Sequence, residues 1–156
     1  MMTKRKNSGF TLVEILIVVV ILGILAAIVI PQFSQASSEA RESSLKSNLQ
    51  AVRSHIELYR IQHNDILPAD AAALESALTT RTDIDGVLWV DGVGYGRYMK
   101  AIPINPFTQE NVVGDVSGDG VDWVYTVVGT GVSATYDFIA DDGGDSPDGL
   151  TPHSDY

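Results

Sequence analysis

The chain has 156 residues, a formal charge of −10 and no cysteine. This length leaves room for one small globular domain beside a membrane-spanning segment, but not for two sizeable cores. The absence of cysteine excludes a disulfide framework, a thiolate metal site and a cysteine nucleophile. The acidic excess disfavours nucleic acid as a partner and favours cations.

An apolar segment of 21 residues, from Phe10 to Ile30, follows a short head that contains Lys4, Arg5 and Lys6. As a helix it would rise about 31 Å, which matches the hydrocarbon core of a bilayer. The positive charge before the segment predicts a cytoplasmic N-terminus, with the rest of the chain outside the cytoplasm. Without these three cations the chain has seven basic and twenty acidic residues, a formal charge of −13.

One ionisable residue, Glu14, lies inside this apolar segment. A carboxylate in a membrane helix costs at least about 2.5 kcal/mol, so it persists where a partner charge or a function compensates for it. Two simpler interpretations remain open, a secretory signal peptide cleaved near Ala36 and a plain membrane anchor. The apolar run is longer than the roughly 7 to 15 residues of a signal core, and an anchor leaves Glu14 unexplained.

The string Lys6–Glu14, the apolar run behind it and Pro31 resemble the N-terminal signature of type IV pilins and type II secretion pseudopilins. The resemblance implies that a prepilin peptidase cleaves between Gly9 and Phe10 and methylates the new amino group of Phe10. It also implies that Glu14 pairs with the Phe10 amine of a neighbouring subunit. Such a buried pair sets register more than stability, because removal of one partner leaves an unpaired charge.

The helical pattern resumes beyond Pro31, which should bend the helix or relax one turn without ending it. Apolar residues then recur at spacings of four, three, four and three: Leu45, Leu49, Val52, Ile56 and Tyr59. This pattern predicts an amphipathic helix over 31–63 that packs against a globular head. A short coiled-coil seam is the alternative.

Residues 64–156 are expected to form this head. Asp70 is placed to cap a short helix that runs to about Thr79. Three apolar residues of that helix should face inward: Leu74, Ala77 and Leu78. Beyond it, Tyr98–Pro106 contains two prolines and should be an extended connector. The connector resembles a stretch that leads into the sheet of the major pseudopilin of type II secretion.

Two segments rich in β-branched and aromatic residues, 122–128 and 134–139, are the best strand candidates. Gly129–Ser133 between them predicts a hairpin loop. The expected fold class is therefore α+β. It is a pilin-like fold in which a long N-terminal helix, half membrane-spanning and half amphipathic, packs on a small antiparallel sheet.

Ten acidic residues follow Lys100 without a single Lys or Arg. Among them, residues 115–122 place oxygen ligands at alternate positions with glycine sixth, as at the start of an EF-hand loop. The candidate calcium ligands are Asp115, Ser117, Asp119 and Asp122. The segment departs from that loop at its twelfth position, Thr126, so a plain Asp/Gly turn is the alternative.

A second acidic cluster, residues 141–149, follows the last predicted strand. Its candidate ligands are Asp141, Asp142 and Asp145. The cluster resembles the stretch that holds calcium in the major pseudopilin of type II secretion, and a flexible acidic tail is the alternative. A calcium ion in either segment would hold the head together in place of disulfides.

The pattern of histidines and motifs does not predict an enzyme. His55 and His63 are eight residues apart, too far for an i, i+4 metal pair, and His153 lies in the tail. The sequence contains no Gly-x-Ser-x-Gly motif, phosphate loop or metalloprotease motif.

The resemblance, together with the missing cysteines, implies a major pseudopilin of type II secretion, because many type IV pilins close a C-terminal loop with a disulfide. It divides the chain into a cleaved leader (1–9), a membrane and filament-core helix (10–30), an amphipathic half (31–63) and a periplasmic head with an acidic tail (64–156). The implied partners are further copies in a helical filament, the prepilin peptidase, an inner-membrane assembly platform and minor pseudopilins. The implied location is the bacterial inner membrane, crossed once, and then a periplasmic or surface filament. A type IV pilin for adhesion, motility or DNA uptake is the alternative.

Overall fold

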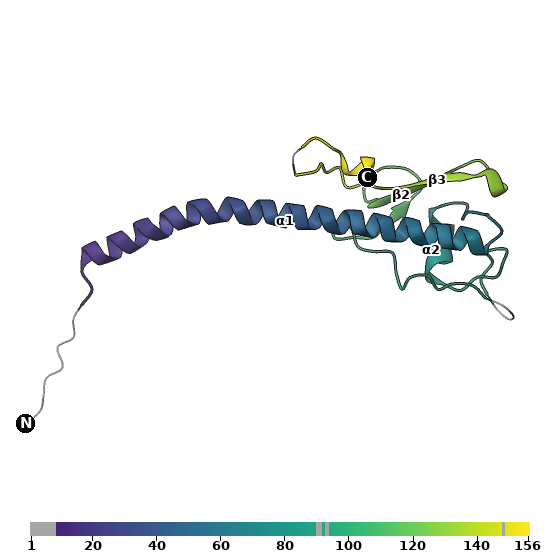
Figure 1. Ribbon diagram of the computed structural model, residues 1–156, viewed down its shortest axis with the longest axis horizontal. Helices are drawn as coiled ribbons and strands as arrows, with labels where there is room; N and C mark the ends of the chain where they lie inside the picture. The colour runs from purple at the N-terminus through teal and green to yellow at the C-terminus, as the bar shows by residue number, and fades with distance from the viewer. Residues whose placement is uncertain (1–8, 90–91, 93, 148) are drawn as a thin grey trace, which may run out of the picture. The chain divides into compact units, whose positions relative to one another are not determined.

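The computed structural model describes residues 9–89, 92, 94–147 and 149–156 (Figure 1). Its helices and strands, in chain order, are α1 (Leu12–Gln62), α2 (Ala71–Thr79), β1 (Val113–Gly114), β2 (Trp123–Val128) and β3 (Thr135–Ala140). Short 3-10 turns cover Gly131–Ser133 and His153–Asp155. The chain divides into two compact units, residues 1–38 and 39–156, and α1 contributes residues to both.

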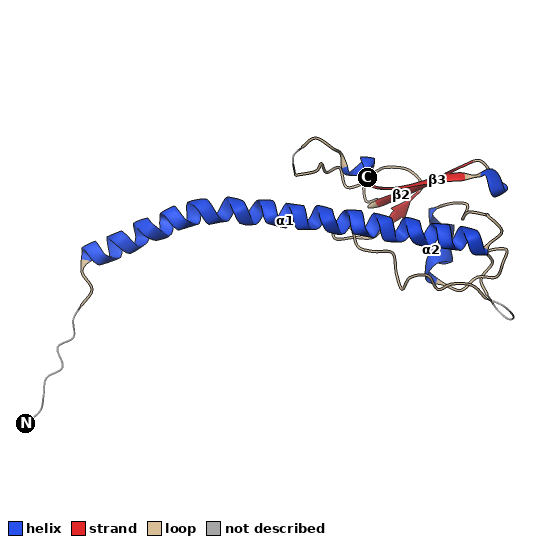
Figure 2. Cartoon of the chain, in the orientation of Figure 1, coloured by secondary structure: helices blue, strands red, loops and turns tan. Residues whose placement is uncertain are grey.

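The first unit contains the N-terminal part of α1, drawn in blue as helix in Figure 2. The helix continues through Pro31, as predicted, so the missing N–H of the proline does not end it. Not one residue of 9–38 is buried within the chain. By length and composition, α1 is the one helix among the described residues that could cross a membrane. A helix segment that is apolar on all sides needs a surrounding that the chain itself does not supply.

In the second unit α1 has the amphipathic character that the sequence predicted. Its buried residues are the five expected ones, Leu45, Leu49, Val52, Ile56 and Tyr59. The helix ends at Gln62, because Asn64 and Asp65 adopt positive φ angles of 55° and 61°. In this left-handed conformation the N–H of Asp65 donates to the carbonyl of Arg60 at 2.9 Å, which satisfies one of the last carbonyls of the helix.

The short helix α2 begins where Asp70 caps it. The carboxylate of Asp70 accepts a hydrogen bond from the N–H of Ala73 at 2.7 Å, which confirms the predicted cap. The residues expected to face inward, Leu74, Ala77 and Leu78, are buried.

The sheet has three strands in the order β1-β2-β3. Strands β2 and β3 form the predicted antiparallel hairpin, with Trp123 opposite Ala140 and Val128 opposite Thr135. Strand β1 runs parallel to β2, so the sheet is mixed and not wholly antiparallel as expected. Sequence reasoning missed β1 because a strand of two residues carries no periodicity.

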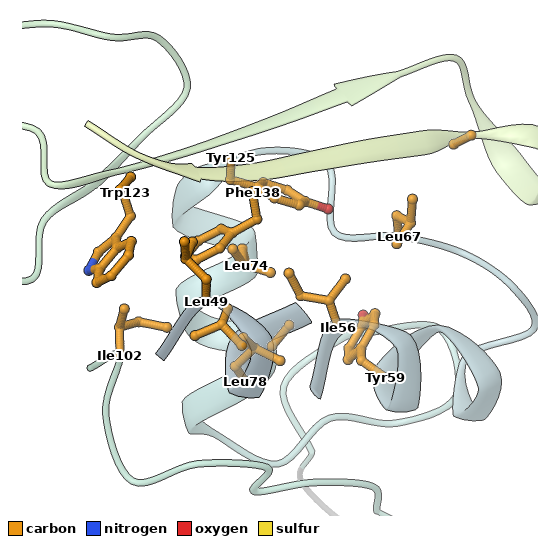
Figure 3. Packing of buried hydrophobic residues seen from close by; sticks show 14 of the residues in the cluster. Leu49, Ile56, Tyr59, Leu67, Leu74, Leu78, Ile102, Trp123, Tyr125 and Phe138 are labelled. Atoms are coloured by element: carbon orange, nitrogen blue, oxygen red, sulfur yellow. The ribbon is translucent and has the colours of Figure 1, made fainter. Parts of the chain in front are cut away.

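The core lies between the sheet, α1 and α2. Figure 3 shows Phe138 pointing from the sheet toward Leu49 and Leu74. The rings of Trp123 and Phe138 stack with their centroids 5.7 Å apart. Tyr125 donates through its hydroxyl to the carbonyl of Pro68 at 3.0 Å, so its polar end is satisfied, and burial raises the pKa of this phenol. The sheet is therefore held against both helices by aromatic side chains.

Candidate functional site

The predicted cleavage site lies just before α1. Gly9 and Phe10 are outside regular secondary structure and both are exposed, with 82% of Phe10 accessible. A Cβ atom placed on Gly9 would meet no atom within 4 Å. The fold therefore does not require glycine at this position, so a requirement for glycine would come from an enzyme that acts on the peptide bond.

Thr11 and Glu14 form a reciprocal cap at the start of α1. The carboxylate of Glu14 accepts from the backbone N–H of Thr11 at 2.8 Å and from its hydroxyl at 2.7 Å. In return, the hydroxyl oxygen of Thr11 accepts from the N–H of Glu14 at 3.3 Å. These contacts make a capping box, in which two otherwise unpaired helix donors are satisfied by side chains.

This cap gives Glu14 a role within its own helix. An acidic side chain in the first turn is favourable because the helix dipole is positive there. The carboxylate is thus partly compensated before any second copy approaches. Sequence reasoning missed Thr11, although the pattern Thr-x-x-Glu before an apolar run is the known signature of this cap.

The acidic segments of the head meet at a pocket of about 450 Å³. Its lining comes from two stretches that are far apart in the sequence, together with Thr108 and Glu110. The first stretch is 117–122, between β1 and β2, and the second is 141–143, after β3.

The hairpin explains why these stretches converge. Because β2 and β3 are antiparallel, the start of β2 at Trp123 lies opposite the end of β3 at Ala140. The acidic residue before β2 therefore meets the acidic residue after β3, and the N–H of Asp141 donates to the carbonyl of Asp122 at 3.0 Å. The sequence pattern indicated two separate calcium sites, whereas the fold brings residues of both acidic segments to a single pocket.

Asp141 is the central carboxylate of this pocket. It accepts from the hydroxyl of Ser117 at 2.8 Å and from the N–H of Gly118 at 2.9 Å. Asp122 is 2% exposed, and its carboxylate accepts from the N–H of Val112 at 2.7 Å. The pocket is thus lined by oxygen atoms that the loop backbone holds in place.

Asp142 lies deeper, with its side chain fully buried. Its carboxylate contacts Nδ1 of His153 at 2.9 Å and accepts from the side-chain amide of Asn105 at 3.2 Å and from the N–H of Gly144 at 2.9 Å. His153, placed by the sequence in the tail, is buried between the rings of Phe107 and Tyr156. Asn105 and His153 anchor the C-terminal segment. Asn105 lies in the connector that the sequence singled out, although not for this role, and no motif indicated His153.

Two predicted ligands lie away from the pocket. The carboxylate of Asp115 accepts a hydrogen bond from the N–H of Ala71 at 2.7 Å, and so satisfies the first backbone donor of α2. Asp145 pairs as an isolated bridge with Pro152. The pocket therefore combines Ser117, Asp119 and Asp122 of the first predicted set with Asp141 and Asp142 of the second.

The polar side chains that line the pocket carry carboxylate and hydroxyl oxygens, which are among the ligands that calcium takes. Among the described residues, however, no three acidic or histidine side chains converge as a ready-made metal site. The chemistry of the pocket fits a calcium ion, and its carboxylates would have to close around the ion on binding.

The sequence of this chain is similar to those of known proteins, first in its N-terminal segment and then over most of its length. A family model described as the prokaryotic N-terminal methylation motif matches residues 4–30, which include Gly9, Phe10 and Glu14. The type II secretion system core protein G of Pseudomonas aeruginosa is 34% identical over 106 residues, covering 68% of this chain and 72% of that protein. The chain belongs to the type II secretion system core protein G family. The core protein G of Aeromonas hydrophila is 38% identical over 108 residues, covering 68% of this chain and 71% of that protein.

The similarity to type IV pilins is more local. The type IV major pilin protein PilA of Myxococcus xanthus is 51% identical over 47 residues, covering 30% of this chain and 21% of that protein. No solved structure matches the chain. The similarity to core protein G covers more than twice the share of the chain that the similarity to PilA covers.

Proposed function

We propose that this core protein G family member is a structural subunit of a type II secretion pseudopilus. In this proposal a prepilin peptidase removes residues 1–9 and methylates Phe10, and the mature chain polymerises into a periplasmic filament that drives protein export. Before assembly the chain crosses the inner membrane once, with its head in the periplasm. Its partners are further copies of itself, the assembly platform and the minor pseudopilins.

One observation carries this proposal. The whole of 9–38 is unburied within the chain, although its larger part, residues 10–30, is apolar except for Thr11 and Glu14. Such a surface is stable in lipid or against apolar helices of other copies, and both surroundings are used in turn by a subunit that moves from membrane to filament. A structural role needs cohesion between copies and no catalytic group.

Glu14 gives the assembly step its specificity in this proposal. Cleavage after Gly9 creates a cationic amine on Phe10, four residues before the carboxylate. The amine of one copy then pairs with Glu14 of its neighbour, in competition with the intrahelical cap from Thr11. An uncompensated charge in an apolar bundle is costly, so only registers that pair the two groups are favoured.

Mass spectrometry of the mature N-terminus tests the processing step. Full-length protein from cells with the peptidase should begin with methylated Phe10. A Gly9→Leu variant should keep its leader while folding normally, because Gly9 is exposed and a Cβ atom there meets no atom within 4 Å. A chain that starts near Ser37, or one that still starts with Met1, would contradict the proposal.

We also propose that the acidic pocket binds calcium and that the ion ties the loop before β2 to the segment after β3. The support is the oxygen-only donor set and the absence of any Lys or Arg after Lys100. A ligand that binds only the folded chain raises its unfolding free energy, by about 2.7 kcal/mol at a hundredfold excess over Kd. The melting temperature rises as a result.

Thermal unfolding of the full chain in detergent, with calcium or magnesium, tests this second proposal. Calcium should raise the melting temperature, and Asp141→Asn should remove most of that rise. Asp115→Asn is the matched control, since Asp115 lies outside the pocket and its substitution should leave the calcium response intact. An equal loss in both variants, or no response in the parent chain, would refute the pocket as the site.

The type IV pilin alternative rests on the 47-residue similarity to PilA. It predicts filaments that extend beyond the cell, whereas a pseudopilus ends within the periplasm. Electron microscopy of cells that produce the chain at its native level separates the two. The acidic head disfavours DNA as a partner in either case, because phosphate binding needs clustered Lys or Arg.

A further inference from the structure

One buried amide, that of Asn105, connects all the parts of the chain that line the acidic pocket. Asn105 is fully buried and is not itself a lining residue. The lining comes from three stretches: Thr108 and Glu110 of one loop, residues 117–122, and residues 141–143. Asn105 forms a hydrogen bond with a residue of each stretch, so it contacts the pocket from behind.

The side-chain nitrogen of Asn105 joins the second stretch to the third. Its Nδ2 donates to the backbone carbonyl of Asp122 at 3.3 Å and to the carboxylate of Asp142 at 3.2 Å. An amide nitrogen carries two hydrogens, so both donors are used. The partners settle the orientation of the amide. Its oxygen accepts from the N–H of Phe107 at 2.9 Å, which can only donate, and the two partners of Nδ2 can only accept.

The backbone of Asn105 closes the first stretch into a loop. Its N–H donates to the carbonyl of Glu110 at 2.7 Å, and its carbonyl accepts from the N–H of Gln109 at 2.9 Å. Pro106, the next residue, fixes its own φ angle and disfavours helical backbone at Asn105. The bonds that place Thr108 and Glu110 at the pocket therefore converge on Asn105.

The hydrogen bonds of Asp142 determine which of its oxygens stays open. Oδ1 accepts from Nδ1 of His153 and from the N–H of Gly144, both at 2.9 Å. Among the described residues, Oδ2 accepts from Asn105 alone. Each carboxylate oxygen has two acceptor positions. A cation in the pocket would therefore reach Asp142 through the second position of Oδ2, beside the hydrogen bond from Asn105.

This arrangement lowers the cost of gathering the carboxylates. Asp122, Asp141 and Asp142 repel one another when they share a small space. The two N–H groups of Asn105 compensate part of the charge of Asp142 and fix the backbone of Asp122 at the same time. Less ordering is then left for an ion to impose, because the three stretches are already joined.

We propose that Asn105 is the positioning residue of the acidic pocket. It holds the three lining stretches in the arrangement that a calcium ion requires, without touching the ion. The inference rests on the proposed calcium function of the pocket and assigns its pre-organisation to one residue. Hydrogen-bond partners of metal-binding side chains contribute about 10- to 100-fold to metal affinity.

Isothermal titration of the full chain in detergent with calcium chloride tests this role. Asn105→Ala should raise the calcium Kd by about 10- to 100-fold. Asn111→Ala is the matched control, because the Asn111 amide also holds a connector carbonyl, that of Ile102 at 3.1 Å, and is not a lining residue. Its Kd should equal that of the parent chain. A merely structural role of Asn105 would lower the melting temperature and leave the Kd of the folded chain unchanged.

Nuclear magnetic resonance of the side-chain amides gives a second measurement, which needs no variant. In the full chain without calcium, the Nδ2 hydrogens of Asn105 should exchange slowly, because both are hydrogen-bonded at a fully buried position. Their signals should shift when calcium chloride is added. The amide signals of Asn111 should stay in place.

The possible outcomes separate the positioning role from calcium binding itself. An unchanged Kd in Asn105→Ala would overturn the positioning role and leave the calcium site intact. Equal increases of Kd in the two alanine variants would show a general loosening of the connector and also overturn it. If Asn105→Ala does not fold, Asn105 signals that do not respond to calcium would overturn it in the same way. A parent chain that takes up no calcium would remove both this inference and the site beneath it.

Discussion

The two parts of α1 differ in where their stability comes from. Residues 12–30 are apolar except for Glu14, and no residue of 12–38 is buried within the chain, whereas residues 39–62 bury one face against the sheet and α2. One continuous helix is thus built for two surroundings. The first part depends on lipid or on other copies, and the second on its own head.

The carboxylates show the same contrast. Glu14 in the first unit is satisfied by Thr11, three residues away on its own helix. Asp142 in the second unit is satisfied by Asn105 and His153, which lie 37 and 11 residues away. Local partners are available before assembly, while distant partners require the folded head. The contacts of Glu14 therefore depend only on its own helix, whereas those of Asp142 depend on folding of the head.

The largest expected effect tests the dependence of the first unit on other copies. In the proposed assembly, Glu14→Ala would remove the partner of the Phe10 amine in a neighbouring copy, which would cost about 3 to 5 kcal/mol per contact. Filament yield, measured by sedimentation and electron microscopy, should fall by more than a hundredfold. The melting temperature of the head should not change.

Glu14→Gln is the matched variant for this prediction. It keeps an acceptor for the cap from Thr11 and loses the charge. Full assembly of the glutamine chain would show that the cap, and not the charge pair, is what the filament needs.

The next effect concerns the core of the head. Phe138→Ala empties a fully buried position and should cost about 3 to 5 kcal/mol of unfolding free energy. Ile21→Ala is the control in the first unit, where the side chain is 51% exposed within the chain. Denaturant titration in detergent should show no change for Ile21→Ala, and equal losses in the two variants would contradict the separation of the units.

A smaller effect compares the two helix caps. Asp70→Ala removes the acceptor for the N–H of Ala73 and should lower the unfolding free energy of the head by about 1 kcal/mol. Thr11→Ala removes the corresponding contact at the start of α1 and should leave head unfolding unchanged. A head that melts earlier in the Thr11 variant would show that the two units unfold together.

The smallest effect is a pH dependence at the C-terminus. Hydrogen bonds from Lys46 and from the Tyr156 hydroxyl hold the pKa of Glu42 below its ordinary value of 4.5. Because the folded-state pKa is lowered, this contribution to stability is present above pH 4.5 and is lost as pH falls through the folded pKa. The protection of backbone amides near Tyr156 against hydrogen exchange, relative to the intrinsic rate at each pH, should therefore fall on acidification. The change should be reduced in Tyr156→Phe, and an unaltered profile there would rule out this contact as the cause.

Local patterns in the sequence determined much of the fold. The spacing of Leu45, Leu49, Val52, Ile56 and Tyr59 defined the buried face of α1 because helical periodicity is a local property. Asp70 and the β2–β3 hairpin were predicted for the same reason, since caps and tight turns involve neighbours in the chain. The N-terminal motif at Gly9–Glu14 was equally clear, because the family model that matches it covers one continuous stretch.

What only the tertiary structure decided were contacts between residues far apart in the sequence. The parallel pairing of β1, the burial of His153 against Asp142 and the joining of two acidic segments into one pocket depend on how strand ends meet. The assignment of Asp115 to α2 and not to the pocket is of the same kind. A linear sequence specifies which side chains are polar, but only chain folding determines which polar groups share a space.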